Sequence, residues 1–506
     1  MGQNFIACDR GQVLLLPPSL TDWLPEDHFV WTVIGAVEQM DLSGFYGAYR
    51  ANGQGKAAYD PQMMVTLLLY AYSLGNRSSR GIERACRDDV ACKVITAMRV
   101  PDHSTIAEFR RRHEQAIGEL FTQVLGLCAE AGLVSVGVVA IDGTRIAANA
   151  SAQRNVDYSG LAREILAEAD RIDREEDERF GQARGDELPE QLQTAAGRRK
   201  ALADAKRRLA EKRAAAPQAD PVEVGFDDQK VIEMHGRGRR AWHVSARQQV
   251  DEHRRREARS VPRDRAGRLL EVEQRMWQQR QAEIDANQLY EQWRAGQSPW
   301  APPKRGGPPP ARWEPPVEPE GRVNLTDPDS RVMQILGGWL QGYNAQTAVN
   351  ENQIVIAAEV SVSSPDFGQL EPMLHTAERQ LQQVGVTSEP EVVLADSGYW
   401  HQHQMERITS RGIPVLIPPD RATRNGERPG WTGGLFTFMR GALTSELGSR
   451  LYRKRKTLIE PVFGDIKFNR RSDRFLRRGR AAVQSEWRLI TATNNLLKLH
   501  QHWITA

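Results

Sequence analysis

The stretch that decides the fold is Val138-Val139-Ala140-Ile141-Asp142, an apolar run that ends in a carboxylate. A second run of the same kind, Val392-Val393-Leu394-Ala395-Asp396, occurs far along the chain. Short β-branched runs bounded by turn residues predict buried strands. An acid at the point where such a strand leaves the core is positioned for chemistry.

A third acid, Glu460, lies in the stretch Lys456-Thr457-Leu458-Ile459-Glu460-Pro461-Val462-Phe463-Gly464. Hard divalent cations bind oxygen ligands, and a magnesium pair that bridges a phosphate needs a few carboxylates with open water positions. Any one acid alone has another explanation, as a helix cap or a turn residue. Three acids in these contexts favour metal-dependent phosphodiester chemistry.

Three motifs carry a resemblance to a known family: Asp142-Gly143-Thr144, Ala395-Asp396-Ser397-Gly398-Tyr399, and Glu460-Pro461-Val462-Phe463-Gly464 with Lys467 beyond it. They resemble the catalytic blocks of bacterial insertion-sequence transposases of the DDE type, and the resemblance covers nearly the whole chain. It implies an α/β fold with a ribonuclease H-like mixed five-stranded sheet. It also implies that the three acids hold two Mg²⁺ or Mn²⁺ ions per active site, and that the protein cleaves DNA at transposon ends and joins it to target DNA.

Many members of that family have a tyrosine, an arginine three residues on, the glutamate four further on and a lysine seven beyond it. Here Lys467 matches, but Lys456 occupies the arginine position and Arg453 the tyrosine position, with Tyr452 one residue early. If this segment is a helix, Arg453, Lys456, Glu460 and Lys467 share one face. We expect Tyr452 and the three cations to contact DNA, and binding to weaken steeply with salt.

The charge of the chain is unevenly distributed. The net charge of the 506 residues is only +3, which alone does not predict a nucleic-acid partner. Residues 451–480, however, contain only the acids Glu460, Asp465 and Asp473 against a large excess of bases: Arg453, Lys454, Arg455, Lys456, Lys467, Arg470, Arg471, Arg474, Arg477, Arg478 and Arg480. This distribution favours double-stranded DNA as the partner, both the terminal inverted repeats and the target.

The compartment follows from the cysteines and from hydropathy. The four cysteines, Cys8, Cys86, Cys92 and Cys128, form no CxxC pair and have no matching histidine cluster, so they indicate reduced thiols. The sequence shows no signal-peptide pattern and no apolar stretch long enough for a membrane span. We expect a cytoplasmic, nucleoid-associated protein that acts as a homo-oligomer, with a dimer the first expectation.

Residues 1–133 are predicted to form a helical DNA-binding or dimerisation domain. Helices are expected to start after Leu24, at Pro61 and near Ser78. A capping box from Thr105 to Glu108 predicts another helix, which bears Arg110, Arg111 and Arg112. A helix-turn-helix that contacts DNA and a dimerisation domain with a solvated arginine face both fit this pattern, and the resemblance favours DNA.

Residues 134–151 carry the first catalytic strand, and residues 152–322 are predicted to be an insertion. Apolar residues at helical spacing in residues 161–172, 188–209 and 269–293 predict long surface helices, followed by an extended proline-rich stretch in residues 298–319. Residues 323–480 are predicted to complete the catalytic domain. They are expected to form a hairpin (342–349 and 354–362), a helix (370–381), a strand ending at Asp396, a strand spanning 413–417 and a late helix carrying Glu460. Residues 481–506 are predicted to form a C-terminal helix.

Several polar residues near the acids have two explanations. Asp327 and Asp329 in Asp327-Pro328-Asp329-Ser330-Arg331 read as a capped turn, while the resemblance leaves these residues and Arg331 a support role at the active site. His401 and His403 suggest zinc, but oxygen-ligated magnesium suits phosphoryl transfer better, so they read as helix-start surface residues.

Two aromatic residues after Asp396, Tyr399 and Trp400, read as core side chains, with stacking on an unpaired base as the alternative. At the level of the whole protein, two alternatives to a transposase remain. One is a catalytically inactive, sequence-specific repressor of the element. The other is a metal-dependent nuclease that does not transfer strands.

Overall fold

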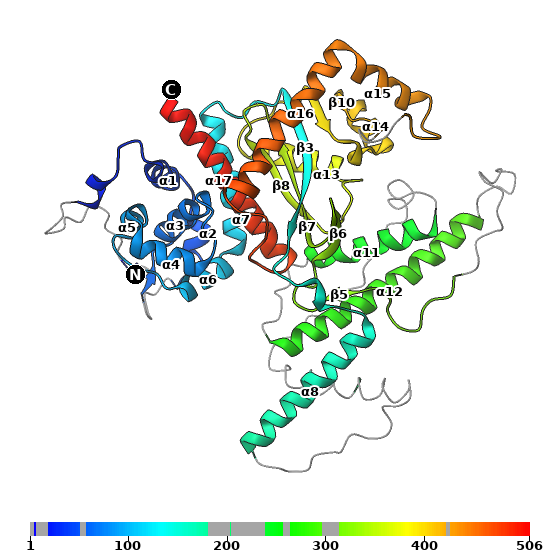
Figure 1. The fold of residues 1–506 in the computed structure, drawn as a ribbon, viewed down its shortest axis with the longest axis horizontal. Coiled ribbons are helices and arrows are strands. Elements are labelled where there is room, and N and C mark those ends of the chain that lie inside the picture. The colour runs from blue at the N-terminus through cyan, green and yellow to red at the C-terminus, as the bar shows by residue number, and fades with distance from the viewer. Residues whose placement is uncertain are drawn as a thin grey trace. The chain divides into compact units, whose positions relative to one another are not determined.

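The computed structural model describes residues 5–6, 19–50, 57–180, 203, 238–256, 264–295, 313–420 and 426–505. The chain forms two compact units (Figure 1). The first unit combines Met1–Asn149 with Val332–Ala506, and the second is the intervening segment Ala150–Arg331. The predicted insertion therefore interrupts a unit that is completed by distant parts of the sequence.

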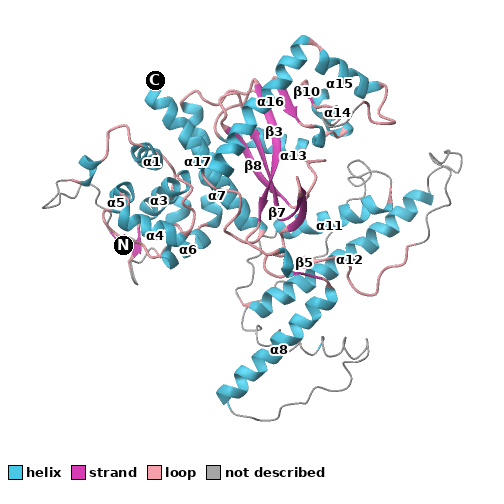
Figure 2. Ribbon diagram, in the orientation of Figure 1, coloured by secondary structure: helices cyan, strands magenta, loops and turns pink. Residues whose placement is uncertain are grey.

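The first unit is built on a mixed sheet, drawn in magenta in Figure 2. Its strands are β3 (Val138–Ala147), β6 (Arg331–Ile335), β7 (Gly338–Val349), β8 (Val355–Ser361), β9 (Val392–Ala395) and β10 (Val415–Leu416). The order is β10-β9-β3-β7-β6, and β8 also pairs with β7. β3 is antiparallel to β7 and parallel to β9. The α/β, ribonuclease H-like class is confirmed, but the sheet has a sixth strand, β6, where five were expected.

Helices pack on the sheet through apolar side chains. The predicted hairpin forms as β7 and β8, and the predicted helix forms as α13 (Leu370–Gln383). The C-terminal helix α17 (Arg480–Thr505) packs on β8. On α17, the fully buried indole of Trp487 donates a hydrogen bond from Nε1 to the carbonyl oxygen of Gln346 on β7, at 3.1 Å.

The N-terminal region is helical, as predicted. Its helices are η1 (Leu20–Trp23), α1 (Phe29–Glu38), α2 (Ser43–Tyr46), α3 (Pro61–Ser73), α4 (Ser79–Asp88), α5 (Val90–Thr96), α6 (His103–Arg112) and α7 (Glu114–Glu130). Pro61 occupies the first turn of α3, and Ser78 caps α4. The capping box predicted at Thr105 is wrong, because the Asp102 carboxylate caps α6 by accepting from the backbone N–H groups of Ser104 and Thr105.

The N-terminal helices and the sheet belong to the same unit. Helix α7 lies along α17, and Figure 1 shows the two side by side. Arg77, just before α4, donates from Nη1 to Glu486 Oε1 on α17 at 3.0 Å, and both side chains are buried. Gly75 adopts φ 75°, and a Cβ there would lie 2.5 Å from the carbonyl oxygen of Arg470. Only glycine allows this close approach.

The second unit has its own small cores. Strand β4 (Asn155–Val156) pairs with β5 (Val323–Asn324), so the start and the end of the unit lie together. Helices α8 (Tyr158–Phe180) and α12 (Arg265–Ala295) share one apolar cluster, and α11 (Arg239–Arg256) packs on α12 through Trp242 and Tyr290. The helices predicted in residues 161–172 and 269–293 are confirmed, whereas α11 was not predicted. Residues 188–209, apart from residue 203, lie outside the described residues, as does the proline-rich stretch before residue 313.

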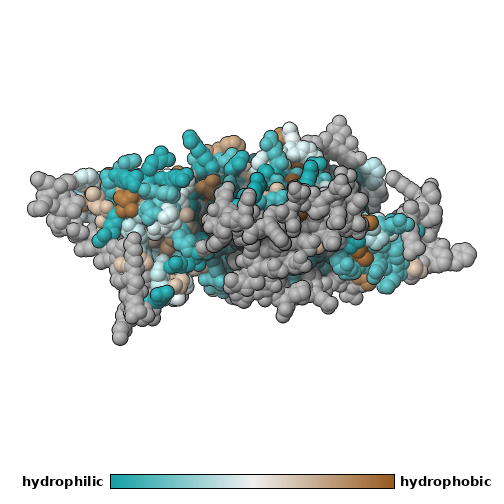
Figure 3. Space-filling model, turned by 90° about the horizontal axis from the view of Figure 1, so that it is seen from below, coloured by the Kyte–Doolittle hydropathy of each residue, from teal (hydrophilic) through white to brown (hydrophobic). Residues whose placement is uncertain are grey.

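The remaining elements complete the first unit: β1 (Phe5–Ile6), β2 (Ala58–Tyr59), η4 (Ser397–Tyr399), α14 (Gln402–Ser410), α15 (Gly434–Thr444), α16 (Glu446–Gly464) and the π-helix η5 (Asp465–Asn469), while η2 (Ala152–Arg154) lies in the second unit. On the face seen in Figure 3, the described residues are mostly hydrophilic with small separate apolar spots. Among the helices of the described segments, none combines the length and the apolar character that a membrane crossing requires.

Candidate active site

Asp142 and Asp396 lie at adjacent positions on neighbouring parallel strands. Ile141 on β3 is in register with Ala395 on β9, and each strand reaches its acid at the next residue. Asp396 Oδ1 accepts a hydrogen bond from the backbone N–H of Gly398 at 2.8 Å, which fixes the turn after β9. The sheet therefore brings together two of the three predicted acids.

The environment of Asp142 opposes its ionisation. Burial raises its pKa to about 7, and the neighbouring carboxylates of Asp396 and Asp366 act in the same direction. The Arg455 guanidinium and the backbone N–H of Gly143 act in the opposite direction. A carboxylate pair of this kind is an unfavourable arrangement that a bound cation would relieve.

We expect the substitution Asp142→Asn to stabilise the metal-free protein at pH 8. The pKa of Asp142 is raised by folding from 3.8, so its contribution to stability is complete below about pH 4 and is lost as pH rises through about 7. Asparagine does not titrate, so the variant should gain about 1–2 kcal/mol over the wild type at pH 8 and much less at pH 5. Urea unfolding at both pH values measures this difference.

A suitable control is Glu38→Gln, which removes the charge of an exposed acid on α1. That variant should show no difference in stability between pH 5 and pH 8 relative to the wild type. Equal stability of Asp142→Asn and the wild type at pH 8 would contradict the proposed strain at Asp142.

Arg455 was not among the predicted site residues, yet it contacts the central acid. Its Nη1 donates to Asp142 Oδ2 at 2.8 Å, and its side chain is only 12% exposed. On α16 it precedes the buried residues Ile459 and Val462 at helical spacing, so it lies on the inward face. This apolar spacing is the sequence signal that identifies Arg455, one residue before the position that the family signature indicates.

Glu460 is placed differently from the two aspartates. It lies on α16, which packs against β3 and β9, but its side chain is exposed. Its electrostatic interaction is with Arg455, which also interacts with Asp142 and Asp396. Glu460 therefore lies on the helix that packs over the two aspartates, but its carboxylate is not beside theirs.

The basic residues around Glu460 divide into two sets. Arg453 and Lys456 are exposed, as is Glu460. Lys467 is half-buried instead, and its Nζ donates to Thr144 Oγ1 at 2.6 Å. Burial lowers the pKa of Lys467. Lys467 lies in a π-helix, which has about one more residue per turn than an α-helix. The expectation that Lys467 shares one helix face with Arg453, Lys456 and Glu460 is therefore wrong.

Tyr452 is partly buried beside the site, with its ring centroid 6.0 Å from the guanidinium carbon of Arg455. Tyr452 and Arg455 therefore form a pair three residues apart, the spacing that the family signature requires for its tyrosine and arginine. The pair is shifted by one position relative to Glu460.

The three N-terminal arginines lie in the last turn of α6 and have different environments. Arg110 is buried and donates from Nη1 to Tyr72 Oη at 2.9 Å and to the carbonyl oxygen of Arg77 at 2.8 Å, so it is a packing residue and the expectation that it contacts DNA is not kept. Arg111 pairs with Glu108, and the Arg112 guanidinium lies 5.5 Å from the centroid of the Tyr49 ring. Of these three arginines, Arg111 and Arg112 remain candidates for DNA contact.

The Asp327-Pro328-Asp329 segment forms a turn within the second unit. The carbonyl oxygen of Asp327 accepts from the N–H of Ser330 at 3.1 Å. Arg275 on α12 donates to Asp329 Oδ1 at 2.6 Å, and Arg331 donates to Asp251 Oδ2 at 2.8 Å. These contacts fit the capped turn rather than support of the acids.

The histidines and aromatic residues after Asp396 have structural contacts. The His401 side chain caps α14 and stacks on Phe367 with ring centroids 4.7 Å apart, so it is a helix-start residue but a buried one. His403 is exposed and lies 3.6 Å from Glu406. Tyr399 and Trp400 are buried, which confirms them as core aromatics.

A buried acid that the sequence analysis did not select, Asp366, lies close to Asp142 and Asp396. Its Oδ1 accepts from Asn344 Nδ2 and from Gln346 Nε2, each at 2.8 Å, and its Oδ2 accepts from Arg145 Nη2 at 2.9 Å. Asn344 and Gln346 are fully buried polar residues that alternate with apolar ones along β7. That alternation was the available signal, because buried amides require partners.

The donor chemistry of the site fits a hard divalent cation, because Asp142 and Asp396 present adjacent carboxylates. Within the described segments, no group of three or more Asp, Glu, His or Cys side chains is arranged to hold a metal ion together. The place of a third carboxylate beside Asp142 is taken by the Arg455 guanidinium. The residues therefore fit a metal site in kind, with Glu460 outside the cluster.

Two family models match the chain. Residues 18–112 match the model described as "Transposase domain (DUF772)", and residues 328–496 match the model described as "Transposase DDE domain". Comparison with curated proteins and with solved structures gave no match. The two models define a protein class that acts on DNA. Within that class, the chain belongs to the insertion-sequence transposases of the DDE type, a family that generally uses divalent metal ions.

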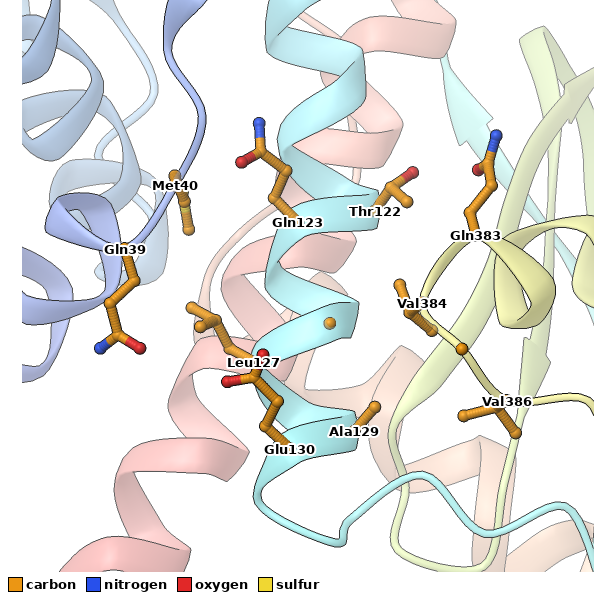
Figure 4. Close-up of a pocket in the computed structure, with 12 residues that line it drawn as sticks. Gln39, Met40, Thr122, Gln123, Leu127, Ala129, Glu130, Gln383, Val384 and Val386 are labelled. Carbon is orange, nitrogen blue, oxygen red and sulfur yellow. The ribbon is translucent and has the colours of Figure 1, made fainter.

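A groove of 620 Å³ lies away from the acids (Figure 4). It is lined by Gln39 and Met40 after α1, by α7 residues that include Thr122 and Glu130, and by residues 383–386 at the C-terminal end of α13. None of the acids or cations considered above lines it. Nothing in the described residues indicates an occupant.

Proposed function

We propose that this transposase cleaves DNA at the ends of its element and joins the freed 3′ ends to target DNA. The observation that carries the proposal is the adjacency of Asp142 and Asp396, each of which directly follows the last residue pair, Ile141 with Ala395, of the parallel β3–β9 ladder. Both acids stand in the motifs on which the resemblance to the DDE family rests. The family match is the second support.

Asp142 and Asp396 would hold magnesium or manganese, with Glu460 as the third ligand and two ions per active site. Bound metal of this kind activates the attacking oxygen and stabilises the leaving oxygen during phosphodiester cleavage. For Glu460 to join the aspartates, its exposed carboxylate must turn toward them and the Arg455 guanidinium must yield Asp142 Oδ2. The exposure of Glu460 leaves its side chain free to reorient.

The cations of α16 and the π-helix are suited to hold DNA phosphates near the acids. Arg453 and Lys456 are exposed, one turn apart. Lys467 donates to Thr144, two residues after Asp142 on β3, and so places a positive charge beside the part of the strand that carries the acid. Loss of such contacts should weaken DNA binding uniformly across sequences and reduce its salt dependence.

The partners follow from the proposed reaction. The substrates would be double-stranded DNA with terminal inverted repeats and a target duplex. Because two element ends must be processed together, we propose a homo-oligomer, a dimer in the simplest case. The protein would act on the nucleoid, in the cytoplasm of a bacterium.

The test of this function is incubation of the full-length protein with Mg²⁺ and labelled duplex DNA that contains the sequences flanking its reading frame. We expect nicks at fixed positions and, with a target plasmid present, joined products. Nicks without joined products would favour a nuclease, because hydrolysis would then end the reaction. Tight sequence-specific binding with no metal-dependent cleavage would favour a repressor.

A DNA substrate with the flanking repeats scrambled is the matched control. Equal nicking of the scrambled duplex would show that the protein does not recognise element ends. Chelation of the metal by EDTA should stop both nicking and joining.

A further inference from the structure

Asp366 is the centre of a polar cluster that lies beside the backbone next to Asp142 and beside the turn that follows Asp396. It is 7% exposed and lies between β8 and α13. Its two carboxylate oxygens accept three side-chain hydrogen bonds, from Arg145, Asn344 and Gln346. With these partners the carboxylate is satisfied by protein donors, which leaves it poorly suited to be a metal ligand itself.

One arm of the cluster reaches the backbone of β3 next to Asp142. Arg145, three residues after Asp142 on β3, donates to Asp366 Oδ2 at 2.9 Å and to the carbonyl oxygen of Ser364 at 2.6 Å. Asp366 also lies directly against the backbone next to Asp142, because a Cβ at Gly143 would be 2.5 Å from Asp366 Oδ1. The carboxylate therefore packs where only glycine fits beside the acid.

The other arm reaches Asp396. The amide of Gln346, which donates to Asp366 from Nε2, accepts a short hydrogen bond at Oε1 from the hydroxyl of Tyr399. Tyr399 is fully buried and ends the turn that Asp396 caps. On the same side, a Cβ at Gly398 would be 2.9 Å from Asp396 Oδ1 and 3.6 Å from Asp366 Oδ2. The two acids thus share one buried anchor.

We propose that Asp366 is a positioning residue that sets the placement of Asp142 and Asp396 relative to each other, through Arg145 on one side and through Gln346 and Tyr399 on the other. This inference rests on the proposed function of the two acids as metal ligands. Groups that orient metal ligands without touching the metal strongly influence metal affinity.

The chemistry of the cluster requires an aspartate at this position. Three donors point at Asp366, and an ionised carboxylate is a pure acceptor that satisfies all of them. Asparagine has the same shape but turns an NH₂ group toward at least one donor and leaves Arg145 without its charged partner. The resulting rearrangement is transmitted to β3 and to the turn after β9.

The experiment measures Mn²⁺ binding to the DNA-free protein by electron paramagnetic resonance, beside nicking of element-end DNA. We expect Asp366→Asn to weaken Mn²⁺ binding about 10–100-fold and to raise the Mn²⁺ concentration for half-maximal nicking by a similar factor. Tyr399→Phe, which removes only one hydroxyl, should shift both quantities in the same direction by a smaller factor. This milder variant keeps the test valid if Asp366→Asn does not fold.

The matched control is Glu486→Gln. Glu486 is also buried, and it also accepts from an arginine, Arg77, while two backbone N–H groups complete its contacts. This variant removes a buried charge far from the acids in sequence, so it should lower stability but leave the Mn²⁺ affinity unchanged. An equal loss of Mn²⁺ affinity in Glu486→Gln would overturn the specific role of Asp366.

Asp396→Asn separates this inference from the proposed function. If the wild type binds Mn²⁺ and Asp396→Asn does not, the metal site is established. Wild-type Mn²⁺ binding by both Asp366→Asn and Tyr399→Phe would then refute the positioning role alone. If Asp396→Asn binds Mn²⁺ as the wild type does, the proposed metal site itself is wrong.

Discussion

Asp396→Asn is expected to reduce the rate of nicking at element ends by at least about 1,000-fold, which corresponds to about 4 kcal/mol of transition-state stabilisation. The substitution replaces an anionic carboxylate, which we propose as a metal ligand, by a neutral amide while keeping the shape of the side chain. The local turn should persist, because asparagine accepts the N–H of Gly398 as well as aspartate does. Single-turnover cleavage of labelled DNA in Mg²⁺ measures the loss.

The control for this variant is Glu391→Gln, at the opposite end of the same strand. Glu391 is exposed, and it immediately precedes β9. It should cleave DNA at the wild-type rate, because its carboxylate is separated from Asp396 by the length of the strand. Retained cleavage by Asp396→Asn would remove Asp396 from the active site.

Trp487→Ala is expected to cost about 3–5 kcal/mol of unfolding free energy. The indole of Trp487 is fully buried, contacts the Phe475 ring at a centroid distance of 6.3 Å, and donates to the backbone of β7. Its removal leaves a large cavity between α17 and the sheet and also leaves the carbonyl oxygen of Gln346 without this donor. Urea unfolding followed by circular dichroism measures the effect.

Two further variants separate the effect of lost packing from the effect of the lost hydrogen bond. Trp487→Phe retains most of the packing and loses the hydrogen bond, so it should cost about 1–2 kcal/mol. Trp503→Ala alters a tryptophan on the same helix that is 44% exposed, and it should change stability far less. If all three variants unfold at the same urea concentration, α17 does not depend on this contact.

The two adjacent aspartates were predictable because their signal is local. The apolar run Val138-Val139-Ala140-Ile141 is buried in full. The expectation that the strand ends at its acid is wrong for Asp142, because β3 continues to Ala147 and Asp142 pairs with Thr347 of β7. The parallel pairing of β3 with β9 then places Asp142 next to Asp396. The burial of the run depends only on neighbouring residues, and the adjacency of the two acids requires only that β3 and β9 pair.

The site residues that the sequence analysis missed depend on packing. Which of Arg455 and Lys456 faces the acids is set by the rotation of α16, and that rotation is fixed by the burial of Leu458, Ile459 and Val462. The family signature placed the arginine one residue too late. The apolar stripe along the helix would have placed it correctly.

Asp366 illustrates a different limit. It follows Ser363-Ser364-Pro365 in a loop, where an aspartate is ordinarily a turn residue. Its role appears only when β3, β7 and the turn after β9 are assembled around it. In the same way, Arg110 looks like one of three solvated arginines in sequence, but folding buries it against Tyr72.

The pairing of β4 with β5 has a consequence for how this protein changes over time. Because the ends of the 150–331 segment are tied together by their own two-stranded ladder, whatever lies between them can lengthen, shorten or be exchanged without pulling on the strands that carry the aspartates. A change of length within the segment is therefore expected to leave the sheet of the first unit in place.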